Sequence, residues 1–85
     1  MEFVVYILYS KKFNKTYVGF TSNLIGRMKS HNELGNDWTK SFRPWKVVYM
    51  EIFDKKIDAM SREKYFKTGR GRIEKDKIIQ QFFIA

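Results

Sequence analysis

Arg27 and Glu63 are charged residues at positions where the surrounding pattern calls for apolar ones. Arg27 lies three residues after Leu24, on or beside the buried stripe of a predicted amphipathic helix. Glu63 lies four residues after Ala59 and three before Phe66, on the inward side of a second predicted helix. A charge in such a place needs a counter-charge, a metal or a cleft. A phosphate site beside a metal ligand would satisfy both residues, and so would a simple Arg27–Glu63 ion pair.

Three further residues have side chains suited to hydrolytic chemistry. His31 follows Arg27 by one helical turn and belongs to the same helix face, where a hydrogen-bonded packing histidine is the favoured alternative. Tyr6 and Tyr17 occur in strand-like segments, in which tyrosine commonly packs. Gly19, on the same strand face as Tyr17, removes a side chain and is expected to open space beside the Tyr17 hydroxyl.

Composition indicates a polyanion-binding protein. Seventeen Lys and Arg against nine Asp and Glu give a net charge of +8 over 85 residues. A basic protein without a polyanionic partner is the alternative. The absence of cysteine excludes disulfides, thiolate zinc sites and a cysteine nucleophile. The longest apolar run, Phe3 to Tyr9, is too short to cross a bilayer, and the N-terminus does not resemble a signal peptide. We therefore expect a cytoplasmic protein with no membrane partner.

The elements that must position these residues form a single α+β domain over residues 1–85, in the order β-β-α-β-α-α. The apolar first strand is expected at the centre of a three-stranded antiparallel sheet, paired with the second strand in a hairpin. Strands are predicted over 2–10, 16–20 and 45–53. The first helix is predicted over 23–34 and the last over 72–84. Between them, a helix is predicted to begin at a cap formed by Asp54 or Asp58 and to end at Gly69. Expected core residues of the last helix are Ile73, Ile78, Ile79 and Phe82.

A basic loop over 36–44 and the chain after residue 63 supply candidate DNA contacts. The loop and its flank interleave aromatic residues with cations, a mixture that contacts phosphates and stacks on exposed bases. Packing at the start of the third strand is the favoured alternative for Trp45, and a solvated face is an equal alternative for the later basic stretch. The aromatic residues are Trp38, Phe42 and Trp45, and the expected nucleic-acid contacts are Lys40, Arg43, Lys46, Lys64, Lys67 and Arg70.

Over nearly its whole length the chain resembles the GIY-YIG nuclease domains, in particular the small stand-alone bacterial branch. The resemblance rests on Val4-Val5-Tyr6 for Gly-Ile-Tyr, Tyr17-Val18-Gly19 for Tyr-Ile-Gly, Arg27 and His31 on the following helix, and Glu63 within SREK. Val4 stands where the family has glycine, and no asparagine follows Asn36 to match the C-terminal asparagine of many members.

The resemblance implies a phosphodiester-hydrolysing endonuclease with Tyr6, Tyr17, Arg27, His31 and Glu63 as catalytic residues. It assigns one divalent metal, Mg²⁺ or Mn²⁺, to Glu63 and the scissile phosphate to Arg27. Tyr17 is the expected general base or water-orienting group, with Tyr6 beside it. A phenol ordinarily titrates near 10, so a tyrosine base needs a neighbouring cation or metal. For His31, orienting water, proton transfer and positioning all stay open.

The expected partner is DNA, branched or flapped more than a fixed sequence, in repair or recombination, with a protein partner possible for targeting. A non-catalytic nucleic-acid-binding module on the same fold is the alternative, motivated by the missing asparagine and the high charge. A regulatory protein–protein adaptor is a third reading, and it would show no salt-dependent affinity for DNA.

Overall fold

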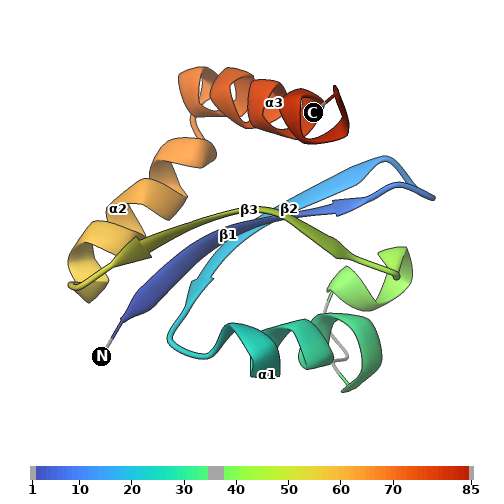
Figure 1. Cartoon of the computed structure of the whole chain (residues 1–85), viewed down its shortest axis with the longest axis horizontal. Coiled ribbons are helices and arrows are strands. Elements are labelled where there is room, and N and C mark those ends of the chain that lie inside the picture. The colour runs from blue at the N-terminus through green and yellow to red at the C-terminus, as the bar shows by residue number, and fades with distance from the viewer. Residues whose placement is uncertain (1, 35–37, 85) are drawn as a thin grey trace.

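Three strands form one antiparallel sheet with helices on both faces (Figure 1). The computed structural model describes residues 2–34 and 38–84, and the side chains of all of these except 33, 34 and 38. The strands are β1 (Phe3–Ser10), β2 (Lys15–Thr21) and β3 (Lys46–Phe53), in the spatial order β2-β1-β3. The helices are α1 (Leu24–Lys29), a π-helix (Ser30–Leu34), a 3₁₀-helix (Trp38–Phe42), α2 (Lys56–Phe66) and α3 (Gly69–Ile84). The α+β architecture and the predicted order of the elements are confirmed.

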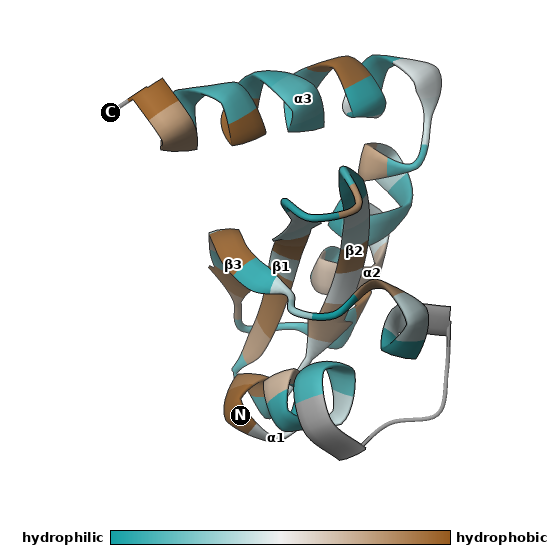
Figure 2. Cartoon of the chain, turned by 90° about the vertical axis from the view of Figure 1, so that its right-hand side faces the viewer, coloured by the Kyte–Doolittle hydropathy of each residue, from teal (hydrophilic) through white to brown (hydrophobic). Residues whose placement is uncertain are grey.

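β1 is the central strand, as its apolar sequence predicted. Val5, Tyr6, Ile7 and Leu8 are all fully buried, and their side chains alternate between the two faces of the sheet. Val5 and Ile7 pack under α2 and α3, whereas Tyr6 and Leu8 pack with Trp45 on the face of α1. Figure 2, which is coloured by hydropathy, shows the helices of the two faces separated by these strands. The sheet therefore has one core on each side.

The helix predicted over 23–34 forms in two parts. Asn23 caps α1, since its side-chain oxygen accepts a hydrogen bond from the Gly26 amide at 3.1 Å. After Lys29 the chain continues as a π-helix, a wider winding that often occurs at functional sites. Arg43 supports this segment from the later loop, because its guanidinium donates to the carbonyl oxygens of His31 at 2.6 Å and Ser30 at 3.1 Å.

The predicted boundaries of the second helix are wrong. α2 begins after Lys55, which makes no side-chain capping bond, and Asp58 lies inside the first turn, where its charge suits the positive end of the helix. Gly69 does not end α2; it is the first residue of α3. The cap between the two helices is Thr68, whose hydroxyl oxygen accepts a hydrogen bond from the amide of Gly71 at 3.1 Å.

Gly71 is required by the tight corner between α2 and α3. A Cβ added at Gly71 would lie 1.8 Å from the carbonyl oxygen of Tyr65, so no other residue fits this approach. The corner sets how α3 crosses the sheet. Ile79 is buried and Ile78 partly buried, as predicted for the core face. Ile73 is 60% exposed and Phe82 37% exposed, so the prediction is wrong for these two residues.

The basic loop expected over 36–44 contains a helical segment. Residues Trp38–Phe42 form the 3₁₀-helix, so the prediction of an irregular loop is wrong there. Trp45 is 4% exposed, and its indole N–H donates to the Thr39 carbonyl at 2.8 Å, which confirms that it packs. The side chain of Trp38 lies outside the described part of the chain. Among the described residues, no helix has the length and apolarity that a bilayer crossing requires.

Candidate active site

The ring of Tyr6 lies across the neighbouring strand β2. Tyr6 pairs with Gly19 in the antiparallel register, and a Cβ added at Gly19 would lie 2.7 Å from the Tyr6 hydroxyl oxygen and 3.0 Å from the ring of Tyr17. The space left by Gly19 is thus filled by Tyr6, which corrects the expectation of free space beside the Tyr17 hydroxyl. Because β2 is an edge strand, this arrangement brings the Tyr6 hydroxyl toward the edge of the sheet.

His31 is fully buried between Tyr6 and the 3₁₀-helix. Its Nε2 lies 3.0 Å from the Tyr6 hydroxyl and its Nδ1 lies 3.0 Å from the Thr39 hydroxyl. The ring centroids of His31 and Tyr17 are 4.9 Å apart. His31 is therefore a hydrogen-bonded packing residue that also fixes both tyrosines. Thr39 was not identified from the sequence, because a threonine in a polar loop gives no sign that the chain will fold over a buried histidine.

Arg27 lies beside the phenols of Tyr6 and Tyr17, which act on its pKa. The pKa of its partly buried guanidinium is raised above the usual range, first by a hydrogen bond to the Tyr6 side chain, with burial acting in the opposite direction. Tyr17 contributes in the same direction. Within the described residues, none of the three ion pairs includes Arg27, so the Arg27–Glu63 ion pair left open by the sequence does not form. The Arg27 charge is solvated by the tyrosines but not neutralised by them.

Tyr6 is held in its protonated form. Burial raises the pKa of its hydroxyl, the hydrogen bond from Arg27 lowers it, and the charges of Tyr17 and Glu63 raise it further. Arginine can only donate, so the Tyr6 oxygen accepts from Arg27 and its O–H is available to donate to the Nε2 atom of His31. Tyr6 thus acts as a fixed neutral bridge between Arg27 and His31 and is unsuited to accept a proton.

Glu63 comes from α2, on the other face of the sheet, yet its charge acts on Tyr6. Its side chain is 20% exposed and pairs with the Nζ of Lys67 at 3.3 Å, one helical turn later. The Lys67 side chain is 59% exposed, and a lysine so exposed moves away from a carboxylate at little cost. The candidate active-site residues therefore come from helices on both faces of the sheet.

The carboxylate of Glu63 fits a hard divalent ion that keeps most of its water. No group of three or more His, Cys, Asp or Glu side chains gathers as a metal cage in the described ranges 2–34 and 38–84. Mg²⁺ is commonly held by one or two carboxylates together with waters and substrate phosphate. A zinc or calcium site built only from protein ligands does not fit this donor set.

A basic hollow of about 200 Å³ lies beside Tyr17. Its cations are Lys67, Arg72 and Lys75, and the Lys75 Nζ donates to the Thr16 hydroxyl at 3.0 Å. None of its lining residues in the described part of the chain is a carboxylate. The sequence placed Lys67 among the DNA contacts, whereas Arg72 and Lys75 could not be separated from a solvated face, because only the corner at Gly71 turns them toward β2.

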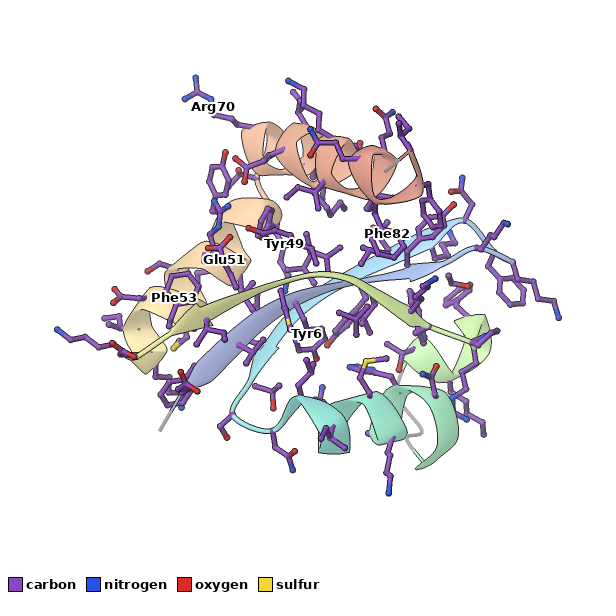
Figure 3. All side chains as sticks on the ribbon, viewed as in Figure 1. Tyr6, Tyr49, Glu51, Phe53, Arg70 and Phe82 are labelled. Atoms are coloured by element: carbon purple, nitrogen blue, oxygen red, sulfur yellow. The ribbon has the colours of Figure 1, made fainter. Side chains whose placement is uncertain are left out.

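The other expected DNA contacts occupy different environments. Lys46 is exposed and its Nζ lies 5.1 Å from the centroid of the Phe82 ring. Arg43 is partly buried and engaged with backbone carbonyls, which gives it a structural role. Lys40, Lys64 and Arg70 are exposed, and Figure 3 shows Arg70 pointing away from the body of the protein. Their contacts with nucleic acid stay predictions.

A central β1 that carries Tyr6, a β2 that carries Tyr17 and Gly19, and later helices that carry an arginine and a glutamate match the order of elements that the GIY-YIG resemblance led us to expect. The model of the GIY-YIG catalytic domain matches residues 2–76. The chain therefore belongs to the GIY-YIG family, which suggests a nuclease-type function.

Within this family the chain is similar to bacterial proteins named UPF0213. It is 41% identical over 78 residues to one from Staphylococcus haemolyticus, covering 91% of this chain and 93% of that protein. It is 44% identical over 69 residues to one from Pediococcus pentosaceus, covering 80% and 72%. The solution NMR structure of a UPF0213 protein from Bacillus halodurans has a TM-score of 0.55 and 28% identity, covering 95% of this chain and 85% of that one.

Proposed function

We propose that this protein is a divalent-metal-dependent DNA endonuclease that hydrolyses phosphodiester bonds. The observation that carries the proposal is the state of Arg27. Its side chain is partly buried, lies beside the phenols that raise its pKa and, within the described residues, is in no ion pair with a carboxylate. Because its side chain is held in place and its charge is not neutralised by a carboxylate, Arg27 is suited to bind a phosphate.

Glu63 would hold Mg²⁺ or Mn²⁺ together with water and substrate phosphate, and Lys67 would have to release the carboxylate. When bound, the metal supplies Lewis-acid stabilisation of the phosphoryl and leaving oxygens. Lys67 also lines the basic hollow beside Tyr17, where it would meet a neighbouring phosphate of the same strand. One lysine would thus neutralise the carboxylate in the free protein and contact DNA in the complex.

The protein's own residues divide the remaining work. Arg27 would bind the scissile phosphate through its planar fork and stabilise the charge that develops there. Tyr17 is the candidate for orienting water and accepting its proton, because Tyr6 is held protonated between Arg27 and His31. His31 would act as a positioning residue, since both ring nitrogens are engaged, one by Tyr6 and one by Thr39.

The substrate would be selected by DNA structure or by weak sequence preference. The net charge of +8 favours binding through phosphates, which carries no sequence information. Branched, flapped or otherwise distorted DNA, met during repair or recombination in the cytoplasm, is the substrate class that we propose. A protein partner for targeting is compatible with such limited specificity.

Cleavage of a panel of flap, splayed-arm, four-way-junction and linear DNAs with Mn²⁺ tests the proposal. We expect the wild-type protein to nick at least one branched substrate, and Glu63→Gln to bind DNA but give no product. Asp58→Asn, an exposed carboxylate on the same helix, is the matched control and should cleave normally. Undiminished cleavage by Glu63→Gln would overturn the metal assignment. Salt-sensitive binding with no product from any protein would instead indicate a non-catalytic binding module.

A further inference from the structure

A hollow of about 710 Å³ lies at the far end of the sheet from the start of β1. The segments that line it are the end of β1 and the turn after it, the start of β3 and the last turns of α3. Its lining residues are Tyr9, Lys11, Lys12, Pro44, Trp45, Lys46 and Phe83. Neither the family match nor the catalytic residues described above assign it a role.

Aromatic rings cover one wall of this hollow. Phe83 is 49% exposed and packs edge-on against Tyr9, with ring centroids 5.3 Å apart. Phe82 lies next to it, 37% exposed, and points from α3 toward the strands (Figure 3). The C-terminal turn of α3 is correspondingly apolar (Figure 2). Exposed rings held by neighbouring rings offer faces on which planar groups stack.

The rim of the hollow is basic. Lys11, Lys12 and Lys46 are all exposed, and none of the described residues that line the hollow is acidic. A second copy of this chain, with its net charge of +8, would bring like charge to this surface. Lysines around aromatic rings match a ligand that has phosphates on its outside and flat bases within reach, which is single-stranded nucleic acid.

Trp45 places this hollow next to Tyr17. It lines the hollow, and its ring centroid is 6.4 Å from that of Tyr17. A strand bound in the hollow therefore passes within one side chain of the candidate active site.

We propose that the hollow between Tyr9, Phe83 and the three lysines binds an unpaired DNA strand, whose bases stack on the rings. The bases of a duplex are already stacked on one another, so only unpaired nucleotides can use these faces. This inference deepens the proposed function, on which it rests, by naming the part of the substrate that the protein recognises. Flapped or splayed DNA would have its unpaired arm in the hollow and its junction at Arg27.

Equilibrium binding separates this role from catalysis. The probe is a fluorescent oligothymidylate, with a duplex of equal length as the second ligand, both measured against Glu63→Gln protein without metal. Phe83→Leu keeps the apolar bulk and removes the ring. We expect it to weaken oligothymidylate binding roughly five-fold or more and to leave duplex binding unchanged.

The Lys11→Gln/Lys12→Gln protein tests the basic rim. We expect weaker oligothymidylate binding and a salt dependence shallower by roughly one unit of slope. The matched control is Lys55→Gln/Lys56→Gln, an adjacent exposed pair at the start of α2 with the same change of charge. Its affinity for oligothymidylate and the slope of its salt dependence should be closer to those of the parent than the values for Lys11→Gln/Lys12→Gln.

The inference is overturned if Phe83→Leu binds oligothymidylate as the parent does, if both lysine pairs act equally, or if a polyglutamate probe binds with the same dependence on Phe83. Cleavage of branched DNA by wild-type protein alongside any of these results leaves the proposed function intact. Conversely, if the protein binds single strands through Phe83 but cuts no substrate, the strand-binding role of the hollow is supported and the proposed endonuclease activity is rejected.

Discussion

Two arginines, one on each side of the sheet, are stabilised in opposite ways. On the face of α2 and α3, Arg62 bonds Glu51 through Nε at 3.1 Å and Glu74 through Nη2 at 2.6 Å. Tyr49 donates to Glu51 at 2.5 Å, and Figure 3 shows both pointing away from the side of Tyr6. On the other face the groups that raise the pKa of Arg27 are the phenols of Tyr6 and Tyr17.

The difference lies in which charges are cancelled. Two carboxylates surround Arg62, whose guanidinium also lies over the rings of Tyr65 and Phe66, and the cluster joins β3, α2 and α3. Arg62 is thus a structural residue, because its charge is neutralised by two carboxylates and its guanidinium packs on aromatic rings. Tyr6 fixes Arg27 without neutralising it. Under the proposed function, Arg62 with its carboxylate partners stabilises the fold, whereas Arg27 beside phenols would keep its charge for a ligand.

The largest expected effect is on catalysis at Arg27. We expect Arg27→Gln to lower the rate of DNA cleavage roughly 100- to 1,000-fold, as removal of a donor to the developing charge does in other enzymes. The free energy of unfolding should change little, because none of the described carboxylates loses an ion-pair partner. Single-turnover kinetics and urea denaturation measure the two quantities. If Arg27→Gln also lowered the free energy of unfolding substantially, Arg27 would be a structural residue like Arg62, which would contradict the comparison.

The second effect concerns the glycine under Tyr6. In Gly19→Ala the added Cβ would lie 2.7 Å from the Tyr6 hydroxyl oxygen and 2.9 Å from Cζ, so the ring must move. We expect a loss of about 1–3 kcal/mol in unfolding free energy, together with weaker cleavage. Gly69→Ala is the control, because no atom lies within 4 Å of a Cβ at Gly69. Normal cleavage by Gly19→Ala would show that the position of Tyr6 is unimportant.

Arg62→Gln tests the other side of the comparison. Loss of the guanidinium leaves two carboxylates without their cation at a partly exposed site, so we expect about 1–2 kcal/mol of destabilisation. In a domain of this size that corresponds to a fall in melting temperature of roughly 4–15 °C. Cleavage below the melting transition should stay within about two-fold of wild type. A large loss of cleavage by folded Arg62→Gln protein would assign this network to the active site.

The smallest effect is on stability in alkali. Burial raises the pKa of Tyr6, and the hydrogen bond to Glu51 raises that of Tyr49. A raised pKa in the folded state means that the stability is present below the ordinary value near 10 and is lost as the pH rises through the folded pKa. Unfolding free energy should therefore fall above about pH 10.

Tyr6→Phe and Tyr49→Phe divide this pH dependence between the two faces of the sheet. Each should make the alkaline fall shallower, and urea denaturation from about pH 8 to about pH 11 measures it. An alkaline fall of unchanged steepness in both proteins would contradict the raised pKa values.

The sequence predicted the fold well where patterns are local. The apolar run of β1 predicted its central place, and Asn23 predicted the start of α1. The corner at Gly71 and the 3₁₀-helix at Thr39 were missed, because each depends on contacts with distant chain. Gly69 was misjudged, since a glycine suits both the end of one helix and the start of the next.

The candidate site was predictable as a set of residues but not as a set of contacts. Spacing placed Arg27 and Glu63 on inward faces without saying whether they meet. The structure gives each a different partner, Tyr6 for Arg27 and Lys67 for Glu63. A hydrogen bond between Tyr6 and His31, twenty-five residues apart, follows only from the packing of the helix on β1.

Paramagnetic broadening by Mn²⁺ compares the two sides of the sheet in one measurement. We expect amide signals around Glu63 and Lys67 to broaden first, signals around Glu51 and Glu74 to persist, and Glu63→Gln to abolish the effect. Carboxylates neutralised by Arg62 should not attract the ion, whereas the Glu63 carboxylate is held only by an exposed lysine. Broadening centred on Glu51 or Glu74, or broadening unchanged in Glu63→Gln, would contradict this expectation.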